Sequence, residues 1–235
     1  MLTSPARHVV AAALALASLG ATSTPSAASH AQPRAVLAAD GLPSAQDLLD
    51  AAQSCRRVSH GTFRASLPGH ADVPVCRAGN AYVWRSSMSI DCDGRTAAQC
   101  SRSTDGDAFA PETAVDQSDG RPFNAATTPY VVLPRPDNPT WSYRDAGISP
   151  GDVAAVIYNG HVEYAVFADV GPRQQIGEAS YATAAALGID PDPSNGGTRG
   201  DVTYVLFPHT RPNPVESHYQ AVQRGRAAAA LLVSR

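Results

Sequence analysis

The chain has 235 residues and a formal net charge of −3, with 43% hydrophobic and 17% charged residues. This length fits one domain of ordinary size, and the apolar fraction excludes a chain that is disordered throughout. The near-neutral charge gives no electrostatic support for nucleic-acid binding, so we expect no nucleic-acid partner.

The first 31 residues follow the order of a secretory signal peptide. They contain no acidic residue, and Arg7 precedes an apolar run at residues 9–17, which is followed by small residues up to Ala31. That run is too short for a membrane-spanning helix, which needs about 20 residues. We therefore predict a signal peptide at 1–31, a flexible segment at 32–43, and a secreted, extracellular protein that has no membrane contact after processing. A non-cleaved anchor is the alternative.

Four cysteines lie between residues 55 and 100, and an even number in an exported protein indicates disulfide bonds. Of the three possible pairings we favour Cys55–Cys76 with Cys92–Cys100, because both bonds close short loops at low entropic cost. A zinc site is disfavoured because the sequence has no CxxC pair and no HxxxH spacing. We expect no metal and no cofactor.

Short elements separated by turns are predicted along the chain. Ser44 and Asp47 resemble a capping box and predict a helix at about residues 45–54. Residues 81–84 and 130–133 are candidate strands. The apolar runs 153–158 and 162–168 flank Asn159-Gly160, which is the sequence signal of a hairpin with a type I′ turn.

Alternation in the second strand of this hairpin places Phe167 and Asp169 on one face. A helix at 181–187 is predicted to end at Gly188, and a strand at 202–207 follows. The tail at about 214–235 is predicted to be a terminal helix. We expect one catalytic domain from residue 44 to 235, with its core at 50–208.

Two carboxylates bracket one loop. Asp169 ends a predicted strand, Glu178 precedes a predicted helix, and the Gly-Pro loop between them can bring both groups into one cleft. Glycoside hydrolysis needs such a pair across the scissile bond, one protonated and one ionised. Each residue also has a structural interpretation: Asp169 could cap a turn, and Glu178 suits a first helical turn, where the dipole favours negative charge.

Several separate motifs resemble glycoside hydrolase family 75, the secreted chitosanases of fungi and some bacteria. The similar segments, in the same order, are residues 90–94 (IDCDG), 129–134 (PYVVLP), 151–160 (GDVAAVIYNG), 167–172 (FADVGP) and 176–180 (IGEAS). The resemblance covers about residues 50–208 and implies internal hydrolysis of β-1,4-linked glucosamine polymer with inversion. The family's two essential carboxylates fall on Asp169 and Glu178. The family usually has an Asp where this chain has Ser89, which bears on substrate contacts and preferred acetylation and not on the pair.

A more distant similarity concerns the fold. The order of strand, Asp-x-Gly-Pro, loop, Ile-Gly-Glu-Ala-Ser, helix and Val-rich strand resembles double-psi β-barrels such as expansins, family 45 endoglucanases and lytic transglycosylases. It implies a mainly β fold, double-psi β-barrel-like with a few short helices, in which Glu178 is the general acid and Asp169 the base. The alternatives are a lytic-transglycosylase-like enzyme that relies on one acid, and an expansin-like protein that binds cell-wall polysaccharide without cutting it.

Five further residues are candidates for contact with chitosan, the expected substrate of a monomeric enzyme. Asp91, Asp93 and Asp116 could pair with its ammonium groups, although turn-holding roles explain them as well. Trp84 and Tyr143 are candidates for stacking on sugar rings, although a Trp is more often part of a core.

Overall fold

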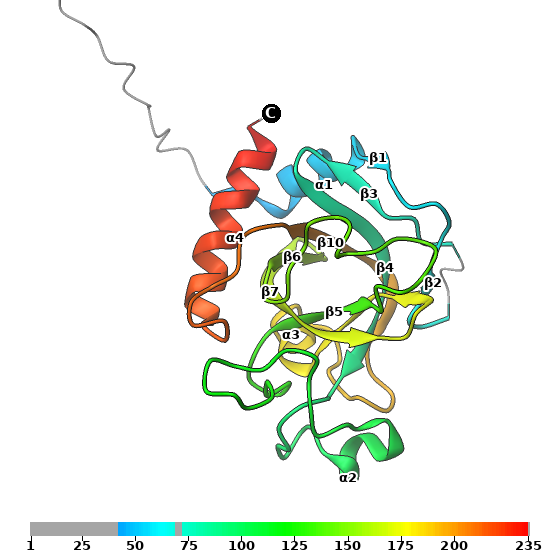
Figure 1. Cartoon of the computed structure of the whole chain (residues 1–235), viewed down its shortest axis with the longest axis vertical. Helices are drawn as coiled ribbons and strands as arrows, with labels where there is room; N and C mark the ends of the chain where they lie inside the picture. Colours follow the sequence, from blue (N-terminus) through cyan, green and yellow to red (C-terminus); the bar gives the residue numbers. More distant parts are fainter. Residues whose placement is uncertain (1–41, 69–71, 235) are drawn as a thin grey trace, which may run out of the picture. The chain divides into compact units, whose positions relative to one another are not determined.

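The computed structural model describes residues 42–68 and 72–234 (Figure 1). The predicted signal peptide at 1–31 and all but the last residues of the segment at 32–43 lie outside the described residues. Within the described ranges, none of the helices combines the length and hydrophobicity that crossing a bilayer requires.

Helices are interspersed among runs of strands of very different lengths. The helices are α1 (Ala45–Gln53), α2 (Arg102–Asp105), α3 (Tyr181–Ala186) and α4 (His218–Val233), with a 3-10 helix η1 at Gly106–Ala108. The strands are β1 (Arg56–Arg57), β2 (Arg64–Ala65), β3 (Cys76–Ala78), β4 (Ala81–Asp91), β5 (Tyr130–Pro134), β6 (Val153–Tyr158), β7 (His161–Gly171), β8 (Gln175–Ile176), β9 (Glu178–Ser180) and β10 (Thr198–Phe207).

Six strands close into a barrel. The hydrogen-bonded order β4, β10, β6, β7, β5, β9 returns to its start because β9 also pairs with β4. Two of the six junctions, β4–β9 and β5–β7, are parallel, and the other four are antiparallel. Strands β1 and β3 extend the sheet beyond β4, and β2 pairs with β8 separately. The prediction of a mainly β, barrel-like fold with a few short helices is confirmed.

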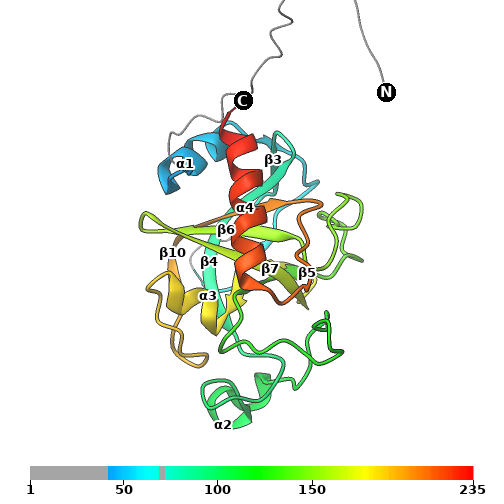
Figure 2. The ribbon, with the colours of Figure 1, turned by 90° about the vertical axis from the view of Figure 1, so that its left-hand side faces the viewer.

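Buried side chains form two clusters, one on each face of the barrel sheet. One cluster draws on all six barrel strands and fills the interior, where the rings of Trp84 and Tyr204 stack with centroids 5.1 Å apart. The other packs outward-facing side chains, such as Tyr164 and Phe207, against α1 and α4. Figure 2 shows α4 lying across β6 and β7. Alternation along each strand therefore determines which side chains fill the barrel and which reach its outer face.

The local signals at two places in the sequence are confirmed. Strands β6 and β7 pair around Asn159 and Gly160, whose φ angles of 47° and 79° are the two positive values that a type I′ turn requires. The capping box of α1 is also formed, because the Ser44 hydroxyl accepts the Asp47 N–H while the Asp47 carboxylate accepts the Ser44 N–H at 2.8 Å.

Several predicted elements have different bounds, and three of them differ by four residues or more at one end. Strand β4 continues to Asp91 instead of ending at 84, and β10 begins at Thr198 instead of 202. The extra residues of β4 pair with β10 and β9, and Thr198 pairs with Met88, which the local pattern does not reveal. Helix α4 begins at His218 instead of about 214, because the Ser217 side chain caps it by accepting the Gln220 N–H.

Candidate active site

Three strands bring acidic side chains to one place on the outer face of the barrel. Asp91 ends β4, Glu178 begins β9, and Asp169 lies near the end of β7. On β5, between β9 and β7, Val132 pairs with Glu178 on one side and with Asp169 on the other. Because neighbouring strands are about 4.8 Å apart, the Cα atoms of Asp169 and Glu178 are about 10 Å apart, with both side chains on the same face.

A β-bulge turns Asp169 towards this face. Val131 pairs with Phe167 and Val132 with Asp169, so Ala168 is an extra residue in β7. A bulge shifts the residues that follow it by one position in the alternation. Phe167 belongs to the interior cluster, whereas Asp169 points outward. The prediction that these two residues share a face is therefore wrong.

Gly177 lets β9 approach β4 closely enough to place Glu178. Its φ is +108°, and a Cβ at this position would lie 2.5 Å from the carbonyl oxygen of Ser87. The Ser89 N–H donates to the Gly177 carbonyl at 3.0 Å, and Ser89 then pairs with Glu178. A Cβ at Gly171 would lie 3.1 Å from Glu178 Oε2, so the Glu178 carboxyl extends across β5 towards β7.

The long connection from β4 to β5 folds over these acids and donates backbone hydrogen bonds to them. The N–H groups of Ala114 and Val170, the latter from β7 itself, both donate to Asp169 Oδ1 at 2.8 Å. The Ala110 N–H donates to Asp93 Oδ1 at 2.6 Å. Hydrogen bonds of this kind favour the ionised form of a carboxylate.

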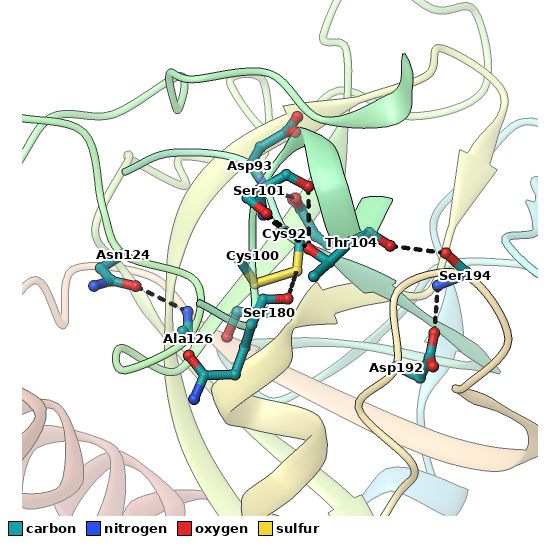
Figure 3. The surroundings of a disulfide bond; sticks show 12 residues. Cys92, Asp93, Cys100, Ser101, Thr104, Asn124, Ala126, Ser180, Asp192 and Ser194 are labelled. Atoms are coloured by element: carbon teal, nitrogen blue, oxygen red, sulfur yellow. Dashed lines mark hydrogen bonds between the residues drawn. A yellow bond between two sulfur atoms is a disulfide. The ribbon is translucent and has the colours of Figure 1, made fainter. Parts of the chain in front are cut away.

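The predicted disulfide Cys92–Cys100 is formed and anchors the start of this connection, with 4.9 Å between the Cα atoms. Figure 3 shows the Asp93 carboxylate pointing away from the disulfide. Further along, the Thr104 carbonyl accepts a hydrogen bond of 2.9 Å from the Ser194 hydroxyl, which ties the connection to the segment before β10 (Figure 3). This connection, residues 92–129, is called the roof below, and the Ser194 contact ties it to the segment before β10.

The second predicted disulfide, Cys55–Cys76, is not formed, and both residues are free cysteines. In the β1–β3 pairing Cys76 lies opposite Arg57, so Cys55 is offset by two residues from the position directly across from it. The two thiols are still neighbours. Burial, then a hydrogen bond and a Coulomb interaction with Cys76, raise the pKa of the Cys55 thiol to about 12.

The carboxyl groups of Glu178 and Asp169 have different electrostatic surroundings. Burial raises the pKa of Glu178 to about 7, and the negative charges of Asp169, Asp93 and Asp105 act in the same direction. Burial also raises the pKa of Asp169, but the two backbone N–H donors described above oppose that shift. Glu178 is therefore protonated below about pH 7, while the hydrogen bonds to Asp169 limit the rise that burial causes in its pKa.

Asp91, Asp93 and Asp169 form a tight cluster in which one carboxylate oxygen of each lies within 4.8 Å of the others. Oxygen-rich clusters also suit hard divalent cations. Here backbone N–H groups point at all three carboxylates, among them the Asp93 N–H, which donates to Asp91 Oδ1 at 2.7 Å. Each of these N–H groups occupies one oxygen of its carboxylate.

Two aromatic candidates for sugar stacking are core residues. Trp84 is 2% exposed and stacks on Tyr204 inside the barrel. Tyr143 is also buried and meets Phe167 edge to face, with ring centroids 4.9 Å apart. Neither ring is accessible to a polysaccharide, so the predictions for Trp84 and Tyr143 are wrong. The apolar area of both rings is buried in the interior cluster instead.

The three acidic candidates for substrate contact occupy different places. Asp91 is only 6% exposed and lies behind Asp169, so its predicted contact with a substrate ammonium group is wrong. Asp93 is partly exposed beside Asp169, and burial raises its pKa to about 6. Asp116 is exposed on the roof, where it forms an isolated bridge with Pro122.

Asp105 and Tyr130 belong to the site, although the sequence did not predict them. Asp105 on α2 adds to the negative charge around Glu178 and Asp93. The Tyr130 hydroxyl, fully buried, donates to the Asp93 carbonyl at 3.0 Å. No sequence signal could have identified them, because the β4–β5 connection has no periodicity and only its path over the barrel brings them to the acids.

Comparisons with known proteins agree with the sequence motifs. The family described as fungal chitosanase of glycosyl hydrolase group 75 matches residues 88–228, which contain all the acids of this site. Endo-chitosanase C of Aspergillus oryzae is 29% identical over 182 residues, which cover 72% of this chain and 44% of that protein. An endo-chitosanase of Aspergillus fumigatus is 31% identical over 146 residues, covering 58% of this chain and 60% of that protein. The chain spans about half the length of the curated relatives it matches.

Proposed function

The chain belongs to the fungal chitosanase family of glycosyl hydrolase group 75, and from that membership we propose that it hydrolyses chitosan internally, at β-1,4 linkages between glucosamine units. The endo-chitosanases to which it is similar support this substrate class. The observation that carries the proposal is the placement of Glu178 and Asp169 on either side of Val132, on one face of the barrel. The signal-like sequence at residues 1–31 supports secretion, and we propose that the enzyme acts as a monomer.

In the proposed reaction, Glu178 donates its proton to the glycosidic oxygen as the bond from that oxygen to the anomeric carbon breaks. Asp169 accepts a proton from a water molecule, whose oxygen bonds to the anomeric carbon from the opposite face. The raised pKa of Glu178, about 7, supports its role as acid. The two N–H groups that donate to Asp169 support its role as base, because they favour the ionised form.

Inversion is the outcome that the family resemblance implies, and the Cα spacing of the two residues is compatible with it. Inverting glycosidases hold their carboxyl groups roughly 6.5–9.5 Å apart to leave room for water, whereas retaining enzymes hold them about 5 Å apart. One strand, β5, lies between the strands of Asp169 and Glu178. The Cα atoms of Asp169 and Glu178 are therefore about 10 Å apart, and the Glu178 carboxyl, which extends towards β7, spans part of that distance.

Local charge supports a cationic substrate despite the modest overall charge of −3. Asp93 and Asp105 are both partly exposed, and each contributes negative charge around Glu178. Ammonium groups of glucosamine units would pair with such carboxylates. We propose that Asp93 contacts the substrate in this way, while Asp116 on the roof is a more distant candidate.

Incubation with chitosan, chitin and peptidoglycan, with product lengths and reducing ends followed, tests the proposed function. We expect short oligomers from chitosan, and proton NMR at early times should show α-anomers at the new ends, because inversion of a β linkage gives the α form. Early β-anomers would contradict inversion. Reducing ends from peptidoglycan only would favour the transglycosylase-like alternative, and no new ends from any polymer would favour the expansin-like one.

The pH dependence of kcat tests the role of Glu178 as acid. Because its pKa is raised to about 7, the protonated, active form lies below that pH, and kcat should fall as pH rises through about 7. Binding of chitosan oligomers to the Glu178→Gln variant over the same pH range is the control, since it reports any loss of substrate charge separately. A kcat that stays flat across neutral pH while binding is retained would contradict this role.

A further inference from the structure

A third carboxyl group lies directly behind the proposed base. The Asp91 side chain is 6% exposed, and one of its oxygens lies within 4.8 Å of oxygens of Asp169 and Asp93. Carboxylates that share so small and buried a site cannot all ionise, so at least one keeps its proton. Asp91 is the most deeply buried of the three, which makes it the group that gains least from ionisation.

Every titratable group that faces Asp91 is itself acidic. From the neighbouring elements these groups are Glu178 on β9, Asp169 on β7, Asp93 after β4 and Tyr130 on β5. Among the described residues, no cation adds to this set. Burial, followed by the charges of Glu178, Asp169 and Asp93, raises the pKa of Asp91 well above its usual range.

The hydrogen bonds around Asp91 indicate where its proton lies. Asp91 Oδ1 accepts the Asp93 N–H at 2.7 Å, which leaves the other oxygen free to carry the proton. The Tyr130 hydroxyl donates to the Asp93 carbonyl at 3.0 Å and also makes a hydrogen-bond contact with the Asp91 side chain. The Asp91 side chain in turn hydrogen-bonds the Asp169 carboxylate, and this contact favours the ionised form of Asp169.

Building on the proposed function, we propose that Asp91 is a positioning residue, which stays protonated and donates a hydrogen bond to Asp169. This bond would fix the orientation of the base and keep it ionised, so that it can accept the proton of the attacking water. The Asp91 proton itself stays in place through the reaction. The role differs from substrate binding, because Asp91 acts on Asp169 from behind.

Replacing Asp91 by Asn and by Ala separates the hydrogen bond from the charge. An Asn side chain has an oxygen for the Asp93 N–H and an amide N–H₂ for Asp169, so it retains both hydrogen bonds. Ala removes the donor, and the pKa of Asp169 should then rise by about one unit. We expect kcat for chitosan in Asp91→Ala to fall about tenfold at acidic pH and to recover partly at higher pH. The acidic limb of its kcat–pH profile should therefore move to higher pH. Asp91→Asn should keep the wild-type limb and a kcat within about threefold.

NMR titration of carbon-13-labelled aspartate carboxyl groups gives a second measurement that needs no substrate. In the wild type one carboxyl should remain protonated through neutral pH, and its signal should be missing from Asp91→Asn. This measurement stays valid even if chitosan is not hydrolysed, so it distinguishes failure of this proposal from failure of the proposed function. It also serves if Asp91→Ala does not fold, because it compares only the wild type with Asp91→Asn.

Asp93→Asn is a matched control in which the pKa of Asp169 should shift in the opposite direction. It removes a negative charge beside Asp169 without removing a donor, so the pKa of Asp169 should fall instead of rise. The proposal is overturned if the wild type lacks the protonated carboxyl, if Asp169 titrates identically in Asp91→Ala and the wild type, or if Asp91→Asn behaves like Asp91→Ala.

Discussion

Replacing Glu178 by Gln is expected to lower kcat for chitosan about 10²–10⁴-fold, the contribution typical of a general acid. The amide has the shape of the carboxyl but carries no proton that it can give to the leaving oxygen. The main chain that places residue 178 is unchanged, because it depends on Gly177 and on pairing with Ser89 and Val132. KM should change much less than kcat, since the lost interaction exists mainly in the transition state.

A substrate with an activated leaving group tests this assignment. A chitosan oligomer with a nitrophenyl group at the scissile bond needs little protonation of the leaving oxygen, so Glu178→Gln should hydrolyse it far more nearly at the wild-type rate. Equal losses on natural and activated substrates would show that Glu178 is not the acid.

Glu163→Gln provides the matched control for this variant. Glu163 lies on β7, another strand of the barrel, and burial raises its pKa as it does that of Glu178. Glu163 pairs with His218 at 2.6 Å and takes no part in the acidic cluster. This variant should retain wild-type kcat. Circular dichroism and thermal unfolding of both variants would establish that a loss in Glu178→Gln is not a loss of fold.

Replacing Asp169 by Asn should cause a loss of the same order, about 10²–10⁴-fold in kcat, because the amide cannot accept a proton from water. Here the activated substrate should not restore the rate, because water must still be deprotonated whatever the leaving group. The two variants thus differ in a qualitative way that separates base from acid. Initial rates on both substrates, measured with folded protein, are the required data.

Asp116→Asn is the control for Asp169→Asn. Asp116 is exposed on the roof and outside the acidic cluster, so its variant should keep kcat within about twofold while any change appears in KM. Near-wild-type turnover in Asp169→Asn would show that one acid suffices. That outcome would favour the transglycosylase-like alternative over inverting hydrolysis.

Local sequence signals predicted the elements that depend only on neighbouring residues. The type I′ turn at Asn159-Gly160 needs two positive φ angles, and few residue pairs other than Asn-Gly supply them at low cost. The Ser44–Asp47 capping box depends on residues three positions apart. The Cys92–Cys100 disulfide closes a short loop and was predicted for that reason. Cys55 and Cys76 fit the same argument by loop length, but the register of β1 against β3 offsets them.

The prediction of aromatic subsites failed for a related reason. An exposed and a buried aromatic side chain have the same sequence signature. Only the closed barrel shows that Trp84 and Tyr143 both belong to its interior cluster. The prediction for Asp91 failed in the same way, because this residue is buried too. An aspartate in a turn-like sequence suggests exposure, but β4 continues to this residue and the β4–β5 connection covers it.

The sequence by itself determined the family and predicted the strand-and-turn pattern around Asp169 and Glu178, because motifs and turn signals are properties of adjacent residues. Only the tertiary structure shows what surrounds those two carboxylates. The bulge at Ala168 turns Asp169 to the face of Glu178, strand β5 separates the two, and the N–H groups of Ala114 and Val170 donate to Asp169. Proton affinity depends on burial, charge and hydrogen bonds from distant segments, so overall charge and local pattern could not reveal which carboxyl keeps its proton.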